Sequence, residues 1–168
     1  MTRGLRIPPQ NIDSEKALLG SVMLRPEGMH EITDIVTPEA FYVGKHRMIY
    51  DSMLNLFSKN EPIDLLSLSS RLKEKNKLEA IGGNTYLTEL VNVVPSAANI
   101  KHYAEIVYRK YAMRSLIGAS EVIAELGYDE TQGLDELLDK AEKKIYDVTS
   151  SPTLHKFVSM RETLGDVW

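Results

Sequence analysis

Residues 99–126 of this 168-residue chain form a long stretch in which Gly118 is the single helix-breaking residue. It contains no proline, and Gly118 is its single glycine, so the pattern predicts one helix of about 28 residues, roughly 40 Å long. A turn containing Gly127 and Gly133 follows, and residues 134–148 then carry a second apolar stripe at helical spacing. A long helix, a short turn and a second striped helix predict an antiparallel helical hairpin.

The long helix has more apolar side chains than a single partner helix can cover. These side chains do not keep to one stripe, and they are Ile100, Tyr103, Val107, Tyr111, Met113, Leu116, Ile117, Val122 and Ile123. A helix that is apolar on all sides has to be buried on several sides, whereas a two-helix hairpin offers one partner helix. We therefore expect a second copy of the chain, or another protein, to pack against the hairpin.

Two sets of apolar residues are the candidates for self-association. They are Tyr103, Val107, Tyr111 and Leu116 on the long helix, and Leu138, Ala141 and Ile145 on the second helix. Packing within the hairpin explains the second set equally well, because these residues belong to the one narrow stripe of that helix. Charged substitutions of Tyr103 and Val107 are expected to weaken self-association while leaving the first part of the chain folded.

Short helical segments separated by proline and glycine occupy the residues before the hairpin. Pro8 and Pro9 favour an extended backbone, and Asn11 is a candidate cap for the apolar helix that follows. Further helix starts are indicated by Thr37, which precedes a proline, and by Asp64. No convincing run alternates between apolar and polar residues, so no strand is predicted.

These patterns predict an all-α protein, with a compact bundle of short helices followed by a long antiparallel helical hairpin. We expect a globular helical head over residues 1–97, the hairpin, as an oligomerisation arm, over residues 98–150, and a linker with the start of a linker helix over residues 151–168. In the last segment, Ser159 and Glu162 have the spacing of a capping box. The apolar residues that accompany this box are Met160, Leu164, Val167 and Trp168.

The charge balance and the absence of cysteine exclude several classes of protein. Twenty basic and twenty-four acidic residues give a net charge of −4, which argues against a DNA-coating surface but permits a local basic patch such as residues 45–47. Without cysteine there are no disulfides and no thiolate sites. No secretory signal is visible, and no apolar run approaches the roughly 18 residues of a membrane span. A soluble cytoplasmic protein is therefore expected.

No motif in the sequence predicts a catalytic, cofactor-binding or metal-binding site. Gly44 and Lys45 resemble the end of a phosphate-binding loop. Such a loop requires a second glycine five residues before Gly44, but that position is occupied by Glu39. His30 begins a pattern similar to a zinc-protease helix, yet the second histidine of that motif is replaced by Asp34. The four histidines are far apart in the sequence, and each is interpreted as a surface or hydrogen-bonded core residue.

Several blocks of the sequence, in order along nearly the whole chain, resemble the amino-terminal region of bacterial replicative DNA helicases of the DnaB type. The blocks are IPPQNIDSEKALLGSVML, the pair Phe41-Tyr42 followed by HRMIYDSM, EPIDLLSL, IGGNTYLTEL, VPSAANIKHYAEIV and LLDKAEKKIYDV. In that family the region is a helical head plus a helical hairpin. The hairpins pair two subunits, and three pairs form a collar on the hexamer.

The resemblance implies a role in assembly and recruitment for this chain. ATP, Mg²⁺ and single-stranded DNA would be bound by the RecA-like motor domain of the parent helicase, which this sequence lacks. The implied partners are further copies of the chain, the helicase-binding domain of primase and, in some bacteria, a helicase loader. The positions that match the primase-binding residues of the family are Asp13, Tyr86, Ile117 and Ile123. Tyr86 is equally well explained as a core residue, and Ile117 and Ile123 are six residues apart, so they cannot share quite the same helix face.

Two other functions remain open on the sequence alone. The helicase-binding domain of a DNA primase has a related head and hairpin, although the sequence blocks favour the helicase. An independent helical module that binds nucleic acid is the second alternative, and a steep salt dependence of DNA affinity would support it. An enzyme is the least favoured class, because no convergent set of titratable groups is visible.

Overall fold

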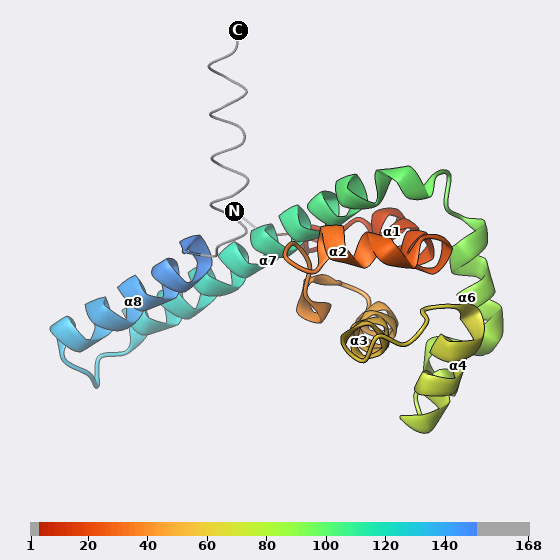
Figure 1. The fold of residues 1–168 in the computed structure, drawn as a ribbon. Coiled ribbons are helices and arrows are strands. Elements are labelled where there is room, and N and C mark those ends of the chain that lie inside the picture. The colour runs from red at the N-terminus through yellow and green to blue at the C-terminus, as the bar shows by residue number, and fades with distance from the viewer. Residues whose placement is uncertain (1–3, 151–168) are drawn as a thin grey trace, which may run out of the picture. The chain divides into compact units, whose positions relative to one another are not determined.

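The computed structural model describes residues 4–150, which form α-helices, short 3-10 helices and turns and contain no strand (Figure 1). This confirms the all-α class that the sequence predicts. The chain divides into two compact units, and the described residues of these units are 4–111 and 112–150. We refer to them as the head unit and the hairpin unit.

Six α-helices and the first part of a seventh belong to the head unit. They are α1 (Ile12–Leu24), α2 (Met29–Ile32), α3 (Gly44–Ser58), α4 (Leu65–Glu74), α5 (Leu78–Ile81), α6 (Gly83–Asn92) and the start of α7 (Ile100–Tyr128). Three single-turn 3-10 helices connect them, namely η1 (Pro26–Gly28), η2 (Pro38–Ala40) and η3 (Ala97–Asn99). The hairpin unit contains the remainder of α7 and α8 (Leu134–Thr149).

Side-chain caps fix two of the helix starts that the sequence predicts. The Asn11 side chain accepts a hydrogen bond from the Ser14 amide at 2.9 Å, and the Asp64 side chain accepts one from the Ser67 amide at 2.8 Å. Each bond satisfies an amide that has no partner within its own helix. Thr37 differs, since its side chain makes no cap bond and only the single turn η2 follows it.

The core of the head unit is built around α1. Leu18, Leu19 and Val22 are completely buried on this helix, and they belong to one apolar cluster that includes residues of α3, α4 and α6. Gly20 permits close packing of α1 against α6, because a Cβ atom there would lie 2.1 Å from the carbonyl oxygen of Leu90. Backbone therefore meets backbone at this crossing, and only glycine fits.

The beginning of α7 completes the head core. Ile100 and Ala104 are fully buried and Val107 is 2% exposed, and all three belong to the apolar cluster of the head. Their spacing of four and three residues places them on one face of the helix. The compact head therefore extends to Tyr111, beyond the boundary at residue 97 that the sequence suggests.

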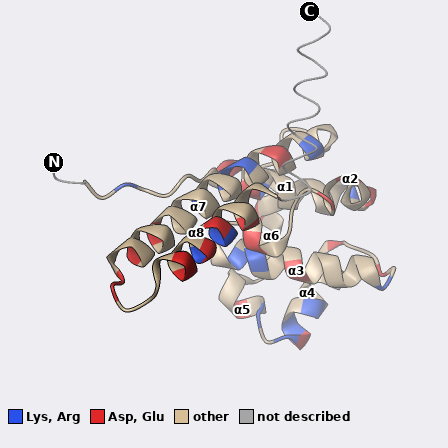
Figure 2. Cartoon of the chain, turned by 90° about the vertical axis from the view of Figure 1, so that its left-hand side faces the viewer, with Lys and Arg blue, Asp and Glu red and all other residues tan. Residues whose placement is uncertain are grey.

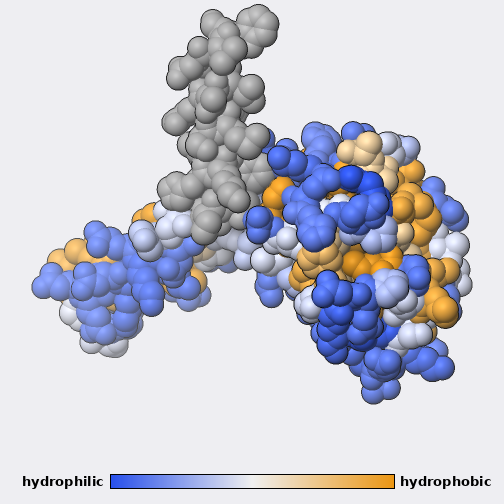
Figure 3. Space-filling model, viewed as in Figure 1, coloured by the Kyte–Doolittle hydropathy of each residue, from blue (hydrophilic) through white to orange (hydrophobic). Residues whose placement is uncertain are grey.

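The hairpin unit leaves much of its apolar surface uncovered. On α8, Leu134 is 70% exposed, Leu138 is 54% exposed and Ile145 is 53% exposed, and no residue of this helix is buried. Leu116 and Ile117 on α7 are exposed as well. Apolar side chains thus remain exposed to solvent on this unit, and Figure 3 shows small orange areas on its mainly blue surface.

Ion pairing supports the polar side of α8. Glu136 and Lys140, four residues apart, form an ion pair, with Nζ of Lys140 3.1 Å from Oε1 of Glu136. Figure 2 shows acidic and basic residues close together along this helix. Such exposed pairs contribute a few tenths of a kcal/mol each, so they cannot compensate for the uncovered apolar stripe.

Two further observations concern the described residues as a whole. No helix within residues 4–150 has both the length and the apolar character that crossing a membrane requires. The predicted capping box at Ser159 and Glu162 lies outside the described residues, as do the apolar residues Met160, Leu164, Val167 and Trp168.

Candidate partner-binding site

A buried carboxylate organises the part of the head where α1, α3 and α6 meet. Glu15, in the first turn of α1, is 2% exposed, and its oxygens accept hydrogen bonds from the amides of Tyr42 and Val43 at 2.9 and 3.2 Å. A third bond joins Glu15 Oε1 to Nδ1 of His46 at 2.8 Å. Glu15 therefore fixes the segment that leads into α3.

His46 connects this carboxylate to Tyr86 on α6. The His46 side chain is 1% exposed, and its Nε2 lies 2.6 Å from the Tyr86 hydroxyl oxygen. The two rings are stacked, with an angle of 11° between their planes. With a neutral imidazole, Nδ1–H donates to Glu15 and Nε2 accepts from the Tyr86 hydroxyl, so that all three side chains have partners. We call Glu15, His46 and Tyr86 the buried triad.

Burial also raises the pKa of the Tyr86 hydroxyl. Removal from solvent, followed by the negative charges of Glu89 and Glu15, raises the pKa of Tyr86 from 10.0 to about 12. Neutral pH lies well below both values, so the hydroxyl is protonated there and can donate a hydrogen bond to His46.

The three basic residues 45–47, which the sequence permits as a local basic patch, make separate contacts in the head. The Lys45 ammonium lies over the Tyr86 ring, 3.5 Å from its centroid. His46 is buried in the triad, and Arg47 donates to the backbone carbonyl oxygens of Phe41 and Tyr42 at 2.6 and 3.3 Å. Each of the three side chains thus has a separate structural role in the head.

The primase-binding residues implied by the family resemblance fall in both units. In the head, Asp13 is exposed in the first turn of α1, while Tyr86 is 7% exposed and belongs to the core cluster. In the hairpin unit, Ile117 is 44% exposed and Ile123 is partly buried. A partner that approaches the head therefore meets little of the Tyr86 side chain directly.

The candidates for self-association also differ in exposure. Val107 is enclosed in the head core, so its predicted contact with a second copy has to be replaced by a packing role within the chain. Tyr103 and Tyr111 are partly buried against the same core. The remaining candidates belong to the hairpin unit, where Leu116, Leu138 and Ile145 are exposed and Ala141 is half-buried.

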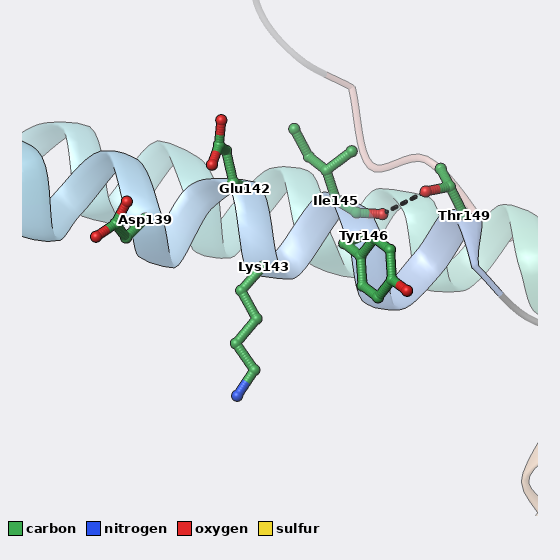
Figure 4. Close-up of a pocket in the computed structure, with 6 residues that line it drawn as sticks. All are labelled: Asp139, Glu142, Lys143, Ile145, Tyr146 and Thr149. Carbon is green, nitrogen blue, oxygen red and sulfur yellow. Dashed lines mark hydrogen bonds between the residues drawn. The ribbon is translucent and has the colours of Figure 1, made fainter.

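Two hollows on the surface do not bring reactive groups together. Asp139, Glu142, Lys143, Ile145, Tyr146 and Thr149 line a hollow of about 560 Å³, and all six belong to α8. Figure 4 shows the side chains of Glu142 and Lys143 pointing in opposite directions. A second hollow, of about 350 Å³, is lined by eight residues of the head, Pro26, Glu27, Phe57, Asn60, Glu61, Pro62, Ile63 and Asp64. Residues 4–150 also contain no cluster of three or more histidine and carboxylate side chains suited to a metal ion.

Fold and surface together define an all-helical domain with a well-packed head and an uncovered apolar hairpin. The family model described as "DnaB-like helicase N terminal domain" matches residues 7–109. The chain belongs to this family of DnaB-like helicase N-terminal domains.

Relatives of known structure and function agree with this assignment. The replicative DNA helicase DnaB of Synechocystis sp. is 42% identical over 158 residues, which are 94% of this chain and 18% of that protein. The crystal structure of the N-terminal domain of DnaB helicase from Mycobacterium tuberculosis is 34% identical, with a TM-score of 0.81, and the match covers 84% of this chain and 99% of that chain.

A third similar structure was described together with its interactions with primase. This DnaB-like replicative helicase is 29% identical, with a TM-score of 0.70 over 90% of this chain and 35% of that chain. The chain thus spans about a fifth of the Synechocystis helicase and about a third of this helicase of known structure.

Proposed function

We propose that this chain is the amino-terminal, non-catalytic part of a hexameric replicative DNA helicase of the bacterial cytoplasm. In this role it joins subunits through the hairpin unit and recruits primase. ATP, Mg²⁺ and single-stranded DNA are bound by the motor domain of the longer protein, and a helicase loader is a further candidate partner. Membership of the DnaB-like family and the similar helicase structure described with primase support this proposal.

The observation that carries the proposal is the uncovered stripe on α8. Leu134, Leu138, Ala141 and Ile145 are spaced by four, three and four residues, which is the spacing of a seam between helices. Three of these four side chains are more than half exposed in the single chain. Two hairpins that share their stripes would form a four-helix bundle and remove this surface from water.

Sedimentation of charged variants tests the self-association. Leu138→Asp and Ile145→Asp place a carboxylate within the proposed interface, so both should reduce the sedimenting mass and its dependence on concentration. Lys143→Asp is the matched control, because Lys143 lies on the opposite side of α8 from Ile145 (Figure 4). Unchanged association of both stripe variants would remove the hairpin from the proposed assembly surface.

Binding experiments test the recruitment of primase. The chain should bind the helicase-binding domain of primase, as measured by isothermal titration calorimetry. Single-stranded DNA should bind weakly, because the net charge is −4 and, of the basic residues 45–47, His46 is buried and Arg47 is bonded to backbone carbonyl oxygens of the head. Tight DNA binding that weakens steeply with salt, together with no binding of primase, would favour the nucleic-acid-binding alternative.

A further inference from the structure

The side chain of Lys45 covers the ring of Tyr86 at the surface of the head. Tyr86 is 7% exposed, its hydroxyl is bonded to His46, and the Lys45 ammonium lies 3.5 Å from the centroid of its ring. A partner that docks at this part of the head therefore meets the Lys45 ammonium before it meets the phenol ring. Tyr86 therefore affects docking indirectly, by fixing the position of the Lys45 ammonium.

The ammonium of Lys45 is free to accept an anionic partner. Among residues 4–150, no carboxylate lies within 4.0 Å of it, although Lys16 on the neighbouring helix is paired with Glu89 at 3.1 Å. Attraction to the ring positions the cation without neutralising its charge. Lys45 is also half-buried, so part of the cost of ordering its long side chain has already been met before a partner arrives.

The buried triad explains why the position of Lys45 is fixed. Tyr86 cannot tilt away from the cation without breaking its bond to His46, and His46 is held in turn by Glu15. Glu15 also binds the two amides that precede Gly44, so the same carboxylate fixes the start of α3, which carries Lys45. Ring and cation are thus positioned by one network.

We propose that Lys45 is the contact residue of this docking surface, that it binds a carboxylate side chain of the partner protein, and that Glu15, His46 and Tyr86 are positioning residues. This inference rests on the proposed function, because it concerns the surface that recruits primase. A carboxylate fits better than a nucleic-acid backbone, since His46 is buried and Arg47 is bonded to backbone carbonyl oxygens, which leaves Lys45 as the one residue of 45–47 that can meet an anion. A phosphate chain requires several cations in a row.

The test measures the affinity of the helicase-binding domain of primase for lysine variants of the chain by calorimetry. Lys45→Met should weaken binding about tenfold and Lys45→Glu about a hundredfold, as expected for a close charge pair at an interface. Lys45→Arg should stay within about threefold, because a guanidinium keeps the charge and stacks on the ring. Lys73→Met, on the exposed side of α4, is the matched control and should bind like the unmodified chain.

A double-mutant cycle tests the positioning role of Tyr86. Tyr86→Leu should lose about as much affinity as Lys45→Met, and the double variant should lose little more, because the ring acts through the cation. Circular dichroism verifies that each variant is folded. If the losses of affinity in Tyr86→Leu and Lys45→Met add up in the double variant, the positioning role is overturned. The comparison of Lys45→Met with Lys73→Met changes no core residue, so it stays valid even if Tyr86→Leu disturbs the fold.

The remaining outcomes separate the inference from the proposed function. If the unmodified chain does not bind the primase domain, the proposed function fails and the inference fails with it. If the chain binds but Lys45→Met and Lys45→Glu bind equally well, only the inference is overturned. If a polythymidine oligonucleotide displaces the primase domain and loses its own binding in Lys45→Glu, Lys45 binds phosphate and the assignment to a carboxylate is wrong.

Discussion

In the head unit, Leu18, Phe41 and Tyr50 are completely enclosed, whereas no residue of α8 in the hairpin unit is buried. Both regions use the same kinds of apolar residue at helical spacing. The head packs elements from several directions around α1, while the hairpin unit offers two helices that cover one side of each other. The exposed apolar stripe of α8 therefore leads us to expect that the hairpin unit associates with a partner.

The same leucine-to-alanine change should have very different effects in the two units. Leu18→Ala removes a completely buried side chain from the head, and we expect it to lower the free energy of unfolding by about 2–5 kcal/mol. Leu138→Ala removes a side chain that is 54% exposed, and it should cost less than about 1 kcal/mol in the dilute single chain. Urea denaturation at low protein concentration measures both values, and equal losses would contradict the comparison.

A glycine-to-alanine change should lower the stability of the head at one position and raise the stability of α7 at another. In Gly20→Ala the new Cβ atom would lie 2.1 Å from the carbonyl oxygen of Leu90 and 2.3 Å from a methyl group of Val94, so the head should lose about 1–3 kcal/mol. At Gly118 in α7 nothing lies within 4 Å of the same atom. There, alanine should raise helix stability by about 0.5–1 kcal/mol. Thermal unfolding followed by circular dichroism distinguishes the two signs.

The result for Gly118 also sharpens the comparison. A loss of self-association in Gly118→Ala, without a loss of stability in the dilute chain, would indicate that a second copy approaches α7 closely at this position. A destabilised dilute chain would instead show that the space around Gly118 is filled by the chain itself, contrary to the open packing described above.

Alkaline pH should weaken the head through Tyr86. The raised pKa means that the folded state favours the neutral phenol, so this contribution is fully present below pH 10.0 and is lost as the pH rises through about 12. Burial raises the pKa of Tyr50 as well, which gives a second loss of the same sign. Tyr86→Phe should remove the contribution of Tyr86 to this loss and leave that of Tyr50. The stability of the variant should therefore fall less between pH 10 and 12 than that of the unmodified chain. Parallel stability curves for the two proteins would contradict the burial of the hydroxyl.

The smallest effect is expected at the helix caps of the head. Asp64→Ala removes the bond to the Ser67 amide and should cost about 1 kcal/mol, whereas Thr37→Ala removes no cap bond and should stay within about 0.5 kcal/mol. The backbone hydrogen bond from Ser67 is the first cause of the lowered pKa of Asp64. The stabilisation is therefore present above the usual value of 3.8 and lost as the pH falls, and the two variants should become similar in acid.

Much of the fold could be predicted from local patterns. The caps at Asn11 and Asp64, the unbroken helix α7 and the striped helix α8 depend on residues close together in the sequence. The extent of the head could not be predicted in this way, because the burial of Ile100 and Val107 depends on distant elements. The surplus of apolar residues on α7 is thus partly used within the chain.

The candidate site was harder to predict, since its members come from three helices. Glu15 and His46 are 31 residues apart, and His46 and Tyr86 are 40 apart. One signal for Glu15 was present, because it lies three and four residues before the buried Leu18 and Leu19 and so falls on the apolar face of α1. A carboxylate on an apolar face needs partners, but the sequence does not say which residues provide them.

Hydrogen exchange of α3 and α8 at several protein concentrations tests the dependence of the hairpin unit on association most directly. We predict that the amides of α8 exchange quickly in dilute solution and become protected as the concentration rises. The amides of α3, within the head, should be protected equally at every concentration. Strong and constant protection of α8 in a chain that sedimentation shows to be single would contradict the account.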